Sequence, residues 1–508
     1  MRLKRGLYNI LFNFIGQGVT ILLGVLIPRL FLVSFGSEMN GLLNSVSQLL
    51  AYASLLEVGI GTASLQSLYS PVEKGDREKV SAIMSATGIF YRKIAFAVTI
   101  GVLAVAFSYP YFIKSEIPKS TVTWVILFNS APYVAGLYVQ SKYKILLEAE
   151  GKLYINANLS TVLHILTNFC KVWLLMAGAD VLTVQFSYMA INLFQVVYFA
   201  RYAKKHYSWV NLKAKPDFSA IAQRNSVLIH KISGVIFRNT DVLILTAIQG
   251  LKSASVYSLY QLFLSMISTA LGNISSGFSF ILAQTFHSDR EKYLKMHDVV
   301  ETYYMTLTFL LYTVAYLCLN PFMALYTRGI TDIRYVDPWL PFLFVFTFLL
   351  SAGREKSCDV INYAQHFRQT KWRAVAEAII NLSVSILCVF RFGIYGVLFG
   401  TIAALLYRTN DIILYANRKI LHRSPWITYR RWLVNFAVFA LAALAGRFVS
   451  IPAENYFQLF LSAAVIFVIL ALLYFSVISL VERQVFRDTL GFAVKIIKPR
   501  FHKREGRK

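Results

Sequence analysis

The chain has 508 residues, of which 57% are hydrophobic and 15% are charged. Ordinary soluble domains are roughly 45–50% apolar and about 25% charged, so this composition excludes a soluble enzyme. Lysine and arginine number 51 against 25 acidic residues, and a net charge of +26 suits either nucleic acid or an anionic membrane surface as partner, depending on where the basic residues lie.

Apolar runs long enough to cross a bilayer recur along the whole chain. A transmembrane helix needs about 20 apolar residues, and runs of this kind bounded by glycine, proline or charge predict fourteen helices. In chain order they cover residues 8–34, 41–66, 92–113, 121–141, 155–177, 181–202, 226–249, 254–284, 301–327, 338–362, 374–390, 394–416, 432–450 and 457–480. Because the runs are continuous, the fold class that we predict is an all-α integral membrane protein.

The basic residues are distributed unequally between the two predicted sides of the membrane. With fourteen spans and a cytoplasmic N-terminus, 37 lysines and arginines fall in cytoplasmic segments and 7 on the opposite side. This asymmetry follows the positive-inside rule and predicts that both termini are cytoplasmic. Since the basic residues are spread over eight short segments and form no compact basic domain, we exclude nucleic acid as a partner.

An internal repeat relates the two halves of the sequence. A shift of 213 residues places Asp76-Arg77-Glu78-Lys79 on Asp289-Arg290-Glu291-Lys292, which links the second predicted span to the eighth. We therefore predict an N-terminal six-helix bundle at 1–202, a cytoplasmic linker at 203–225, a second six-helix bundle at 226–418 and helices 13 and 14 at 419–481. The basic, amphipathic tail 482–508 is expected to lie on anionic membrane lipids.

Charged residues inside the predicted spans are the sharpest functional signal, because each costs roughly 2.5–3.5 kcal/mol at the bilayer centre. The basic ones are Arg29, Lys171, Lys231, Arg238, Arg354, Lys356 and Arg408, and the acidic ones that we count are Glu57, Asp241, Glu355, Asp359 and Asp411. Pairing leaves two positive charges over, which predicts a hydrated cationic cavity that attracts an anion. The alternative is that these residues form ion pairs, such as Arg408 with Asp411 one helical turn apart, or extend to the membrane surface.

The sequence carries no recognisable catalytic or metal-binding pattern. A phosphate-binding GxxxxGK[ST] loop is absent, the four cysteines form no CxxC pair, and the eight histidines form no HExxH motif. We therefore expect no catalytic residue, no metal and no cofactor, and we predict that the protein is not an enzyme.

Several short motifs resemble those of a known family. They are 36–42 (GSEMNGL), 56–63 (LEVGIGTA), 147–152 (LEAEGK) and 239–241 (NTD), with a Gly-Asp turn at 75–76. In these, and over nearly the whole chain, the sequence is similar to the polysaccharide flippases of bacterial envelopes, called Wzx or O-antigen transporters, within the multidrug/oligosaccharidyl-lipid/polysaccharide (MOP) superfamily.

The resemblance implies a function and its setting. It implies that the two bundles are arranged as in the MATE exporters. It also implies that this protein carries an isoprenoid-diphosphate-linked oligosaccharide from the inner to the outer leaflet of the bacterial cytoplasmic membrane by alternating access. An ion gradient of H⁺ or Na⁺ would drive transport, with no other cofactor. Polysaccharide polymerase and glycosyltransferases are candidate partners in cell-surface polysaccharide biosynthesis.

Site residues follow from the charge of this substrate. Because guanidinium groups bind diphosphate through two hydrogen bonds, we expect Arg29, Lys171, Arg238 and Arg354 to bind the head group. Glu57 or Asp241 is expected to take part in ion coupling. The alternatives are a cation-coupled drug or metabolite exporter of the same superfamily, a membrane polysaccharide polymerase or ligase, and a scaffold of the glycan assembly machinery.

Overall fold

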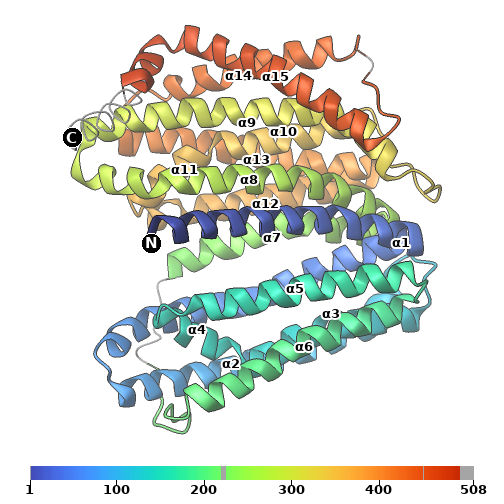
Figure 1. The fold of residues 1–508 in the computed structure, drawn as a ribbon, viewed down its shortest axis with the longest axis vertical. Coiled ribbons are helices and arrows are strands. Elements are labelled where there is room, and N and C mark those ends of the chain that lie inside the picture. Colours follow the sequence, from blue (N-terminus) through green and yellow to red (C-terminus); the bar gives the residue numbers. More distant parts are fainter. Residues whose placement is uncertain (1, 219–224, 450, 492–508) are drawn as a thin grey trace. The chain divides into compact units, whose positions relative to one another are not determined.

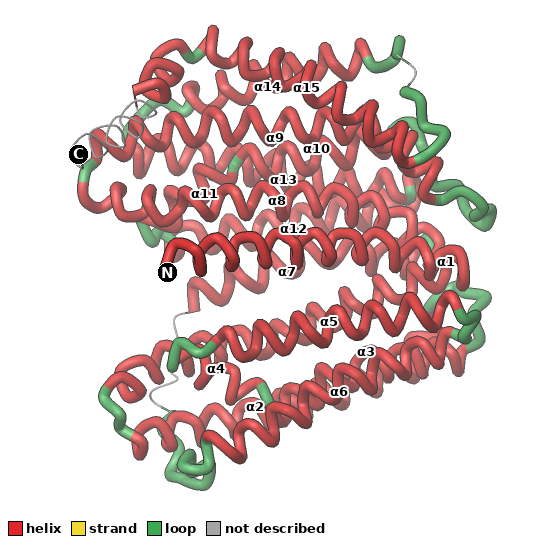
Figure 2. Tube along the Cα trace, in the orientation of Figure 1, coloured by secondary structure: helices red, strands yellow, loops and turns green. Residues whose placement is uncertain are grey.

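A computed structural model describes residues 2–218, 225–449 and 451–491, and all regular structure in these ranges is helical (Figure 2). The helices are α1 (Arg2–Glu73), α2 (Arg77–Phe112), α3 (Lys119–Val139), α4 (Ser141–Ala149), α5 (Leu153–Met176), α6 (Val181–His206), α7 (Asn225–Ile248), α8 (Leu251–Ser288), α9 (Arg290–Tyr326), α10 (Leu340–Gly353), α11 (Glu355–Tyr363), α12 (Phe367–Phe392), α13 (Ile394–Tyr415), η2 (Ala416–Leu421), α14 (Trp426–Ala445) and α15 (Tyr456–Val481). The all-α fold class is confirmed.

The fourteen predicted segments all fall on helices, but not one to one. The segments 8–34 and 41–66 both lie in α1, whose backbone leaves helical geometry at Gly36, where φ is 76°. Glycine adopts this left-handed conformation without the steric cost that a Cβ atom would add. Within the described ranges, ten helices are long and apolar enough to cross a membrane on their own, or up to eleven if the bent pair inside α1 is one span. The total of fourteen membrane-spanning helices stays a prediction.

Two local features differ from the predicted elements. The segment 338–362 is divided at Arg354 into α10 and α11. The short helix α4 was not expected, because nine residues are too few for a search based on membrane-spanning runs. It buries Ile145, Leu146 and Leu147 against the core of the N-terminal helices.

The matched repeat motifs begin corresponding helices. Asp76 accepts a hydrogen bond from the backbone N–H of Lys79 at the start of α2, at 3.0 Å. Asp289 caps α9 in the same way, accepting from the N–H of Lys292 at 3.0 Å. An aspartate at this position satisfies an N–H group that has no partner inside the helix. The identical caps agree with the predicted repeat.

The chain divides into two compact units. Unit 1 comprises Met1–Ser258, Gly329–Ile333 and Ser385–Val397, and unit 2 comprises Leu259–Arg328, Arg334–Val384 and Leu398–Lys508. In unit 1, α2 packs on α3, α3 on α6 and α5 on α6, and Figure 1 shows these long helices side by side. In unit 2, α9 packs on α10, α14 and α15. The predicted bundle boundaries remain a prediction.

Large apolar side chains are exposed along many helices. On α15 they include Phe457, Phe460, Leu461 and Val468, which are 56–75% exposed. An apolar surface of this extent needs lipid as its solvent. The protein is therefore a multi-pass integral membrane protein. Of the tail 482–508, residues 483–491 are helical, and residues 492–508 lie outside the described ranges.

Candidate functional site

Five charged side chains form a continuous chain of ion pairs in unit 2, here called the arginine chain. Arg354 lies 2.7 Å from Glu377, whose second carboxylate oxygen lies 3.5 Å from Arg408. Arg408 lies 2.5 Å from Asp411, which also pairs with Arg373. Three guanidinium groups thus share two carboxylates, so the arginine chain has one excess positive charge.

Local structure explains how the arginine chain is assembled. Arg354 stands at the break between α10 and α11. Arg373 and Glu377 lie one turn apart on α12, and Arg408 and Asp411 lie one turn apart on α13, so each pair shares a helix face. The Arg408 side chain is only 6% exposed and that of Arg373 is 37% exposed. The Arg373 end can therefore present guanidinium N–H groups to an anion.

The arginine chain corrects the charge count made from the sequence. The predicted pairing of Arg408 with Asp411 is confirmed. The count behind the surplus of two positive charges was incomplete, because it omitted two acids, Glu301 and Glu377, and four basic residues that also lie inside the predicted spans, Arg92, Lys93, Arg201 and Arg447. Within the five residues of the arginine chain the excess is one positive charge.

Lys171 occupies an aromatic environment in unit 1. Its ammonium nitrogen lies 4.5 Å from the ring centre of Tyr188 on α6 and 5.9 Å from that of Phe31 on α1. Aromatic faces stabilise a cation by about 0.5–2 kcal/mol without neutralising it. No described carboxylate lies within ion-pair distance of Lys171, so this positive charge is available to an anion.

The other predicted head-group residues are dispersed in the structure. Arg29 is half-buried on α1, two residues before Phe31, and Arg238 is exposed on α7. Both belong to unit 1, as does Lys171, whereas Arg354 belongs to unit 2. The role of these four residues in binding a head group stays a prediction.

The two candidate coupling carboxylates are held by tyrosines. Glu57, half-buried on α1, accepts a hydrogen bond from the Tyr133 hydroxyl at 3.2 Å. Asp241, 3% exposed on α7, accepts one from the Tyr257 hydroxyl at 2.7 Å. A carboxylate held in this way can bind a proton or a cation only by rearranging its hydrogen bonds. Their role in ion coupling also stays a prediction.

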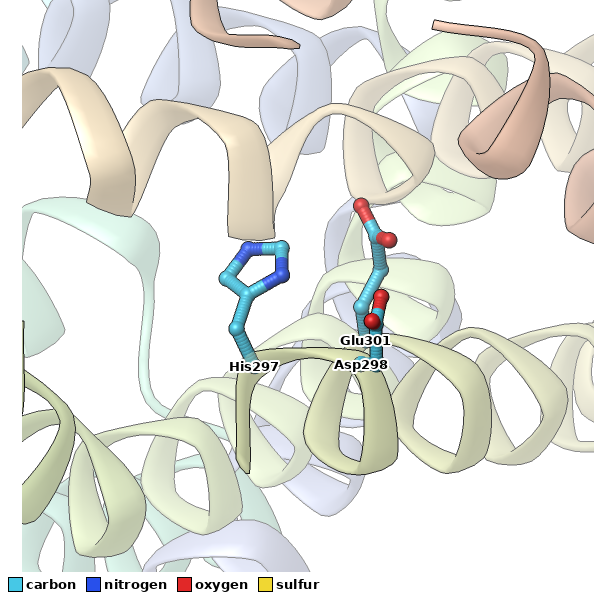
Figure 3. A group of neighbouring side chains, drawn as sticks. All are labelled: His297, Asp298 and Glu301. Atoms are coloured by element: carbon cyan, nitrogen blue, oxygen red, sulfur yellow. The ribbon is translucent and has the colours of Figure 1, made fainter. Parts of the chain in front are cut away.

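The sequence analysis missed a second cluster, formed by His297, Asp298 and Glu301 near the start of α9. Figure 3 shows the three side chains projecting from this helix, and their candidate ligand atoms all lie within 4.8 Å of one another. Glu301 and His297 are 1% and 2% exposed. Within the described residues, neither ring nitrogen of His297 has a hydrogen-bond partner. The sequence signal that could have predicted this cluster is the i, i+1, i+4 spacing of its three residues, which brings their side chains together on a helix.

Two arginines show that this cluster is an ion-pair junction rather than a metal centre. Arg423 lies 2.6 Å from Asp298 and 3.1 Å from Glu301. Arg431 on α14 lies 2.8 Å from Asp298 and 2.5 Å from Glu301. A divalent cation on these carboxylates would have to displace both guanidinium groups. The donor set therefore does not fit a resident metal, and the junction instead joins α9 to α14.

The fold of this chain is similar to those of known membrane proteins. No protein-family model and no curated relative matches the sequence. Among solved structures, the chain is similar to the lipid II flippase MurJ in an inward closed conformation, with a TM-score of 0.66 and 12% identity over 92% of this chain and 99% of that one. It is also similar to a multidrug resistance MATE transporter of the MOP superfamily in an inward-facing conformation, with a TM-score of 0.60 and 12% identity over 79% of this chain and 94% of that one.

The fold is shared with these structures, which are all membrane proteins of similar helical architecture. More narrowly, the chain shares its fold with MATE transporters in two conformations and with a lipid flippase, all of which match over most of their lengths. An outward-facing MATE transporter matches less well, with a TM-score of 0.52. The predicted MATE-like fold is thus confirmed, whereas membership of the superfamily and assignment to the polysaccharide flippases stay predictions.

Proposed function

We propose that this protein is a flippase that moves an isoprenoid-diphosphate-linked oligosaccharide from the inner to the outer leaflet of the bacterial cytoplasmic membrane. The observation that carries the proposal is the arginine chain, in which three guanidinium groups share two carboxylates among mainly buried side chains. A diphosphate supplies the missing negative charge and matches the forked geometry of arginine. In unit 1, Lys171 on its aromatic faces is a separate candidate for contact with an anion.

The similarity to a flippase supports the same proposal. The lipid II flippase matches 92% of this chain, whereas the two MATE transporters match 79% and 80%, so about a fifth of the chain has no counterpart in the exporters. A drug or metabolite exporter remains the second candidate, because it shares the fold. Its cationic substrates would be repelled by the excess charge of the arginine chain. A transporter fold disfavours the polymerase or ligase alternative.

The proposal is tested by flipping in vesicles. Purified protein is reconstituted into liposomes that contain undecaprenyl-diphosphate-linked N-acetylglucosamine, and the sugar that becomes accessible to a membrane-impermeant lectin is followed over time. We expect Arg354→Ala and Arg238→Ala to slow flipping by about 10- to 100-fold, because each removes a charged hydrogen bond of about 1.5–3 kcal/mol.

Controls separate transport from folding. Arg238 is exposed, so its loss leaves no buried carboxylate without a partner. Arg354→Lys keeps the charge that faces Glu377 and should fold, yet it loses the forked geometry and should flip slowly. Arg328→Ala, an exposed arginine after α9, should flip at the wild-type rate. Wild-type rates for both alanine variants would refute the cationic site.

Ion coupling makes a separate prediction at Glu57. Glu57→Gln mimics a permanently protonated side chain and keeps an acceptor for the Tyr133 hydroxyl. We expect gradient-driven flipping to fall by about tenfold and to lose its dependence on pH, because the carboxylate no longer exchanges a proton. The measurement is flipping rate against external pH, with exposed Glu73→Gln as the control. An unchanged pH profile would exclude Glu57.

A further inference from the structure

Helix α5 exposes two sectors of opposite character. One sector is apolar and consists of Val162, Ile165, Leu166, Phe169 and Trp173, all 43–70% exposed. The other is polar and contains Thr161, His164, Asn168 and Lys171, of which Thr161 and His164 are exposed. At 100° per residue these are two separate stripes along the helix.

The two stripes cannot share one solvent. The apolar stripe suits lipid, but an imidazole and an ammonium in hydrocarbon would together cost several kcal/mol. Charged and polar side chains within membrane spans face protein or water-filled space. His164 and Thr161 are exposed and so not covered by protein, whereas Asn168 is buried, and we infer that the exposed part of the polar stripe faces water.

Helix α6 extends the polar stripe with its own polar face. The amide of Gln195 donates to the Ser160 hydroxyl at 3.0 Å, and that of Asn192 to Thr167 at 3.4 Å. These bonds between helices are the usual way in which polar groups hold membrane helices together.

His164 and Lys171 are not explained by helix association. Among the residues that the structure describes, His164 has one hydrogen-bond partner, Asn168 on the same helix, at 3.1 Å. The Lys171 ammonium lies 4.5 Å from the ring centre of Tyr188 on α6. From position 164 to position 171 the helix rises about 10 Å. Over this length of about 10 Å, the polar stripe and Tyr188 thus offer hydrogen-bond donors, hydrogen-bond acceptors and an aromatic ring.

We propose that His164, Asn168 and Tyr188 bind the sugar part of the substrate, next to the positive charge of Lys171. This inference rests on the proposed function and concerns residues of unit 1 alone. Sugar hydroxyl and acetamido groups need neighbouring donors and acceptors, which imidazole, amide and phenol side chains supply. The ammonium of Lys171 then faces the adjoining diphosphate.

The test compares two lipids that differ only in the sugar. Binding of undecaprenyl diphosphate and of undecaprenyl-diphosphate-linked N-acetylglucosamine to the detergent-solubilised full chain is measured by tryptophan fluorescence titration. We expect the wild type to bind the sugar-bearing lipid about tenfold more tightly, the effect of one ordinary hydrogen bond. His164→Leu should abolish this preference without changing the affinity for undecaprenyl diphosphate, and His164→Gln should retain part of it.

Gln195→Leu is the matched control, because it removes the hydrogen bond to Ser160 but leaves His164 in place. It should lower stability and keep the sugar preference. The inference is overturned if the wild type binds both lipids equally, if His164→Leu keeps the preference, or if Gln195→Leu loses it as fully as His164→Leu. Failure of the wild type to bind either lipid would overturn the proposed function, and this inference with it.

Discussion

Replacing Glu301 by glutamine is expected to lower the free energy of unfolding by about 3 kcal/mol, because two guanidinium groups then lose a shared carboxylate inside the protein. Arg423 and Arg431 both contact this carboxylate, and the Thr428 hydroxyl donates to it at 3.0 Å. Asp298 keeps its own contacts with both arginines, which places the loss at the low end of the range for broken buried pairs. The measurement is the melting temperature in detergent, followed by intrinsic fluorescence.

The same helix offers a matched control. Glu291 pairs with Lys295 at 2.8 Å, one turn apart, and its side chain is 81% exposed. Glu291→Gln should cost only about 0.3–0.5 kcal/mol, because water screens the pair. Equal melting temperatures for the two variants would show that the junction does not stabilise the fold.

This junction explains how the last two helices are held. Arg431 on α14 reaches Glu301 on α9, and Arg430 next to it pairs with Glu482, which follows α15, at 2.5 Å. The predicted repeat leaves the last two predicted spans, 432–450 and 457–480, outside both bundles. In the structure these spans are α14 and α15, and both pack on α9 within unit 2. Polar anchoring at one end complements the apolar packing of Leu459 and Cys318 along the helices.

The course of the helices was largely predictable, because membrane spans need long apolar runs that few other structures contain. The exceptions are local. The first two predicted spans meet at a kink at Gly36 inside α1, and α10 ends at Gly353 inside a predicted span. Neither follows from hydropathy, since both depend on the backbone conformation of one or two residues.

The candidate site was less predictable, because the partners of an ion pair between two helices are not separated by any characteristic number of residues in the sequence. Arg408 with Asp411 was found from its one-turn separation on α13. Glu377 was overlooked, although it is the acid that joins Arg354 to Arg408. The contact between Glu301 and Arg431 spans 130 residues and required the fold itself.

Gly41→Ala is expected to destabilise unit 1 by at least about 3 kcal/mol, at the upper end of the range for overpacking. A Cβ atom at Gly41 would lie 2.0 Å from the carbonyl oxygen of Leu251 at the start of α8 and 2.8 Å from its carbonyl carbon. Backbone atoms cannot move aside by a change of rotamer, so α1 would have to separate from α8. That separation would strain the hydrogen bond from Asn40 to Ser255, at 2.7 Å.

Gly101→Ala is the control for this substitution, since nothing lies within 4 Å of a Cβ at that position on α2. Alanine there should stabilise the helix by up to about 1 kcal/mol, so the two variants should move the melting temperature in opposite directions. The contrast isolates packing from helix propensity, because both glycines lie within helices. If Gly41→Ala melts at or above the wild-type temperature, the close approach of α1 and α8 is not required for the fold, and the polar contacts beside it would have to hold the two helices at a larger distance.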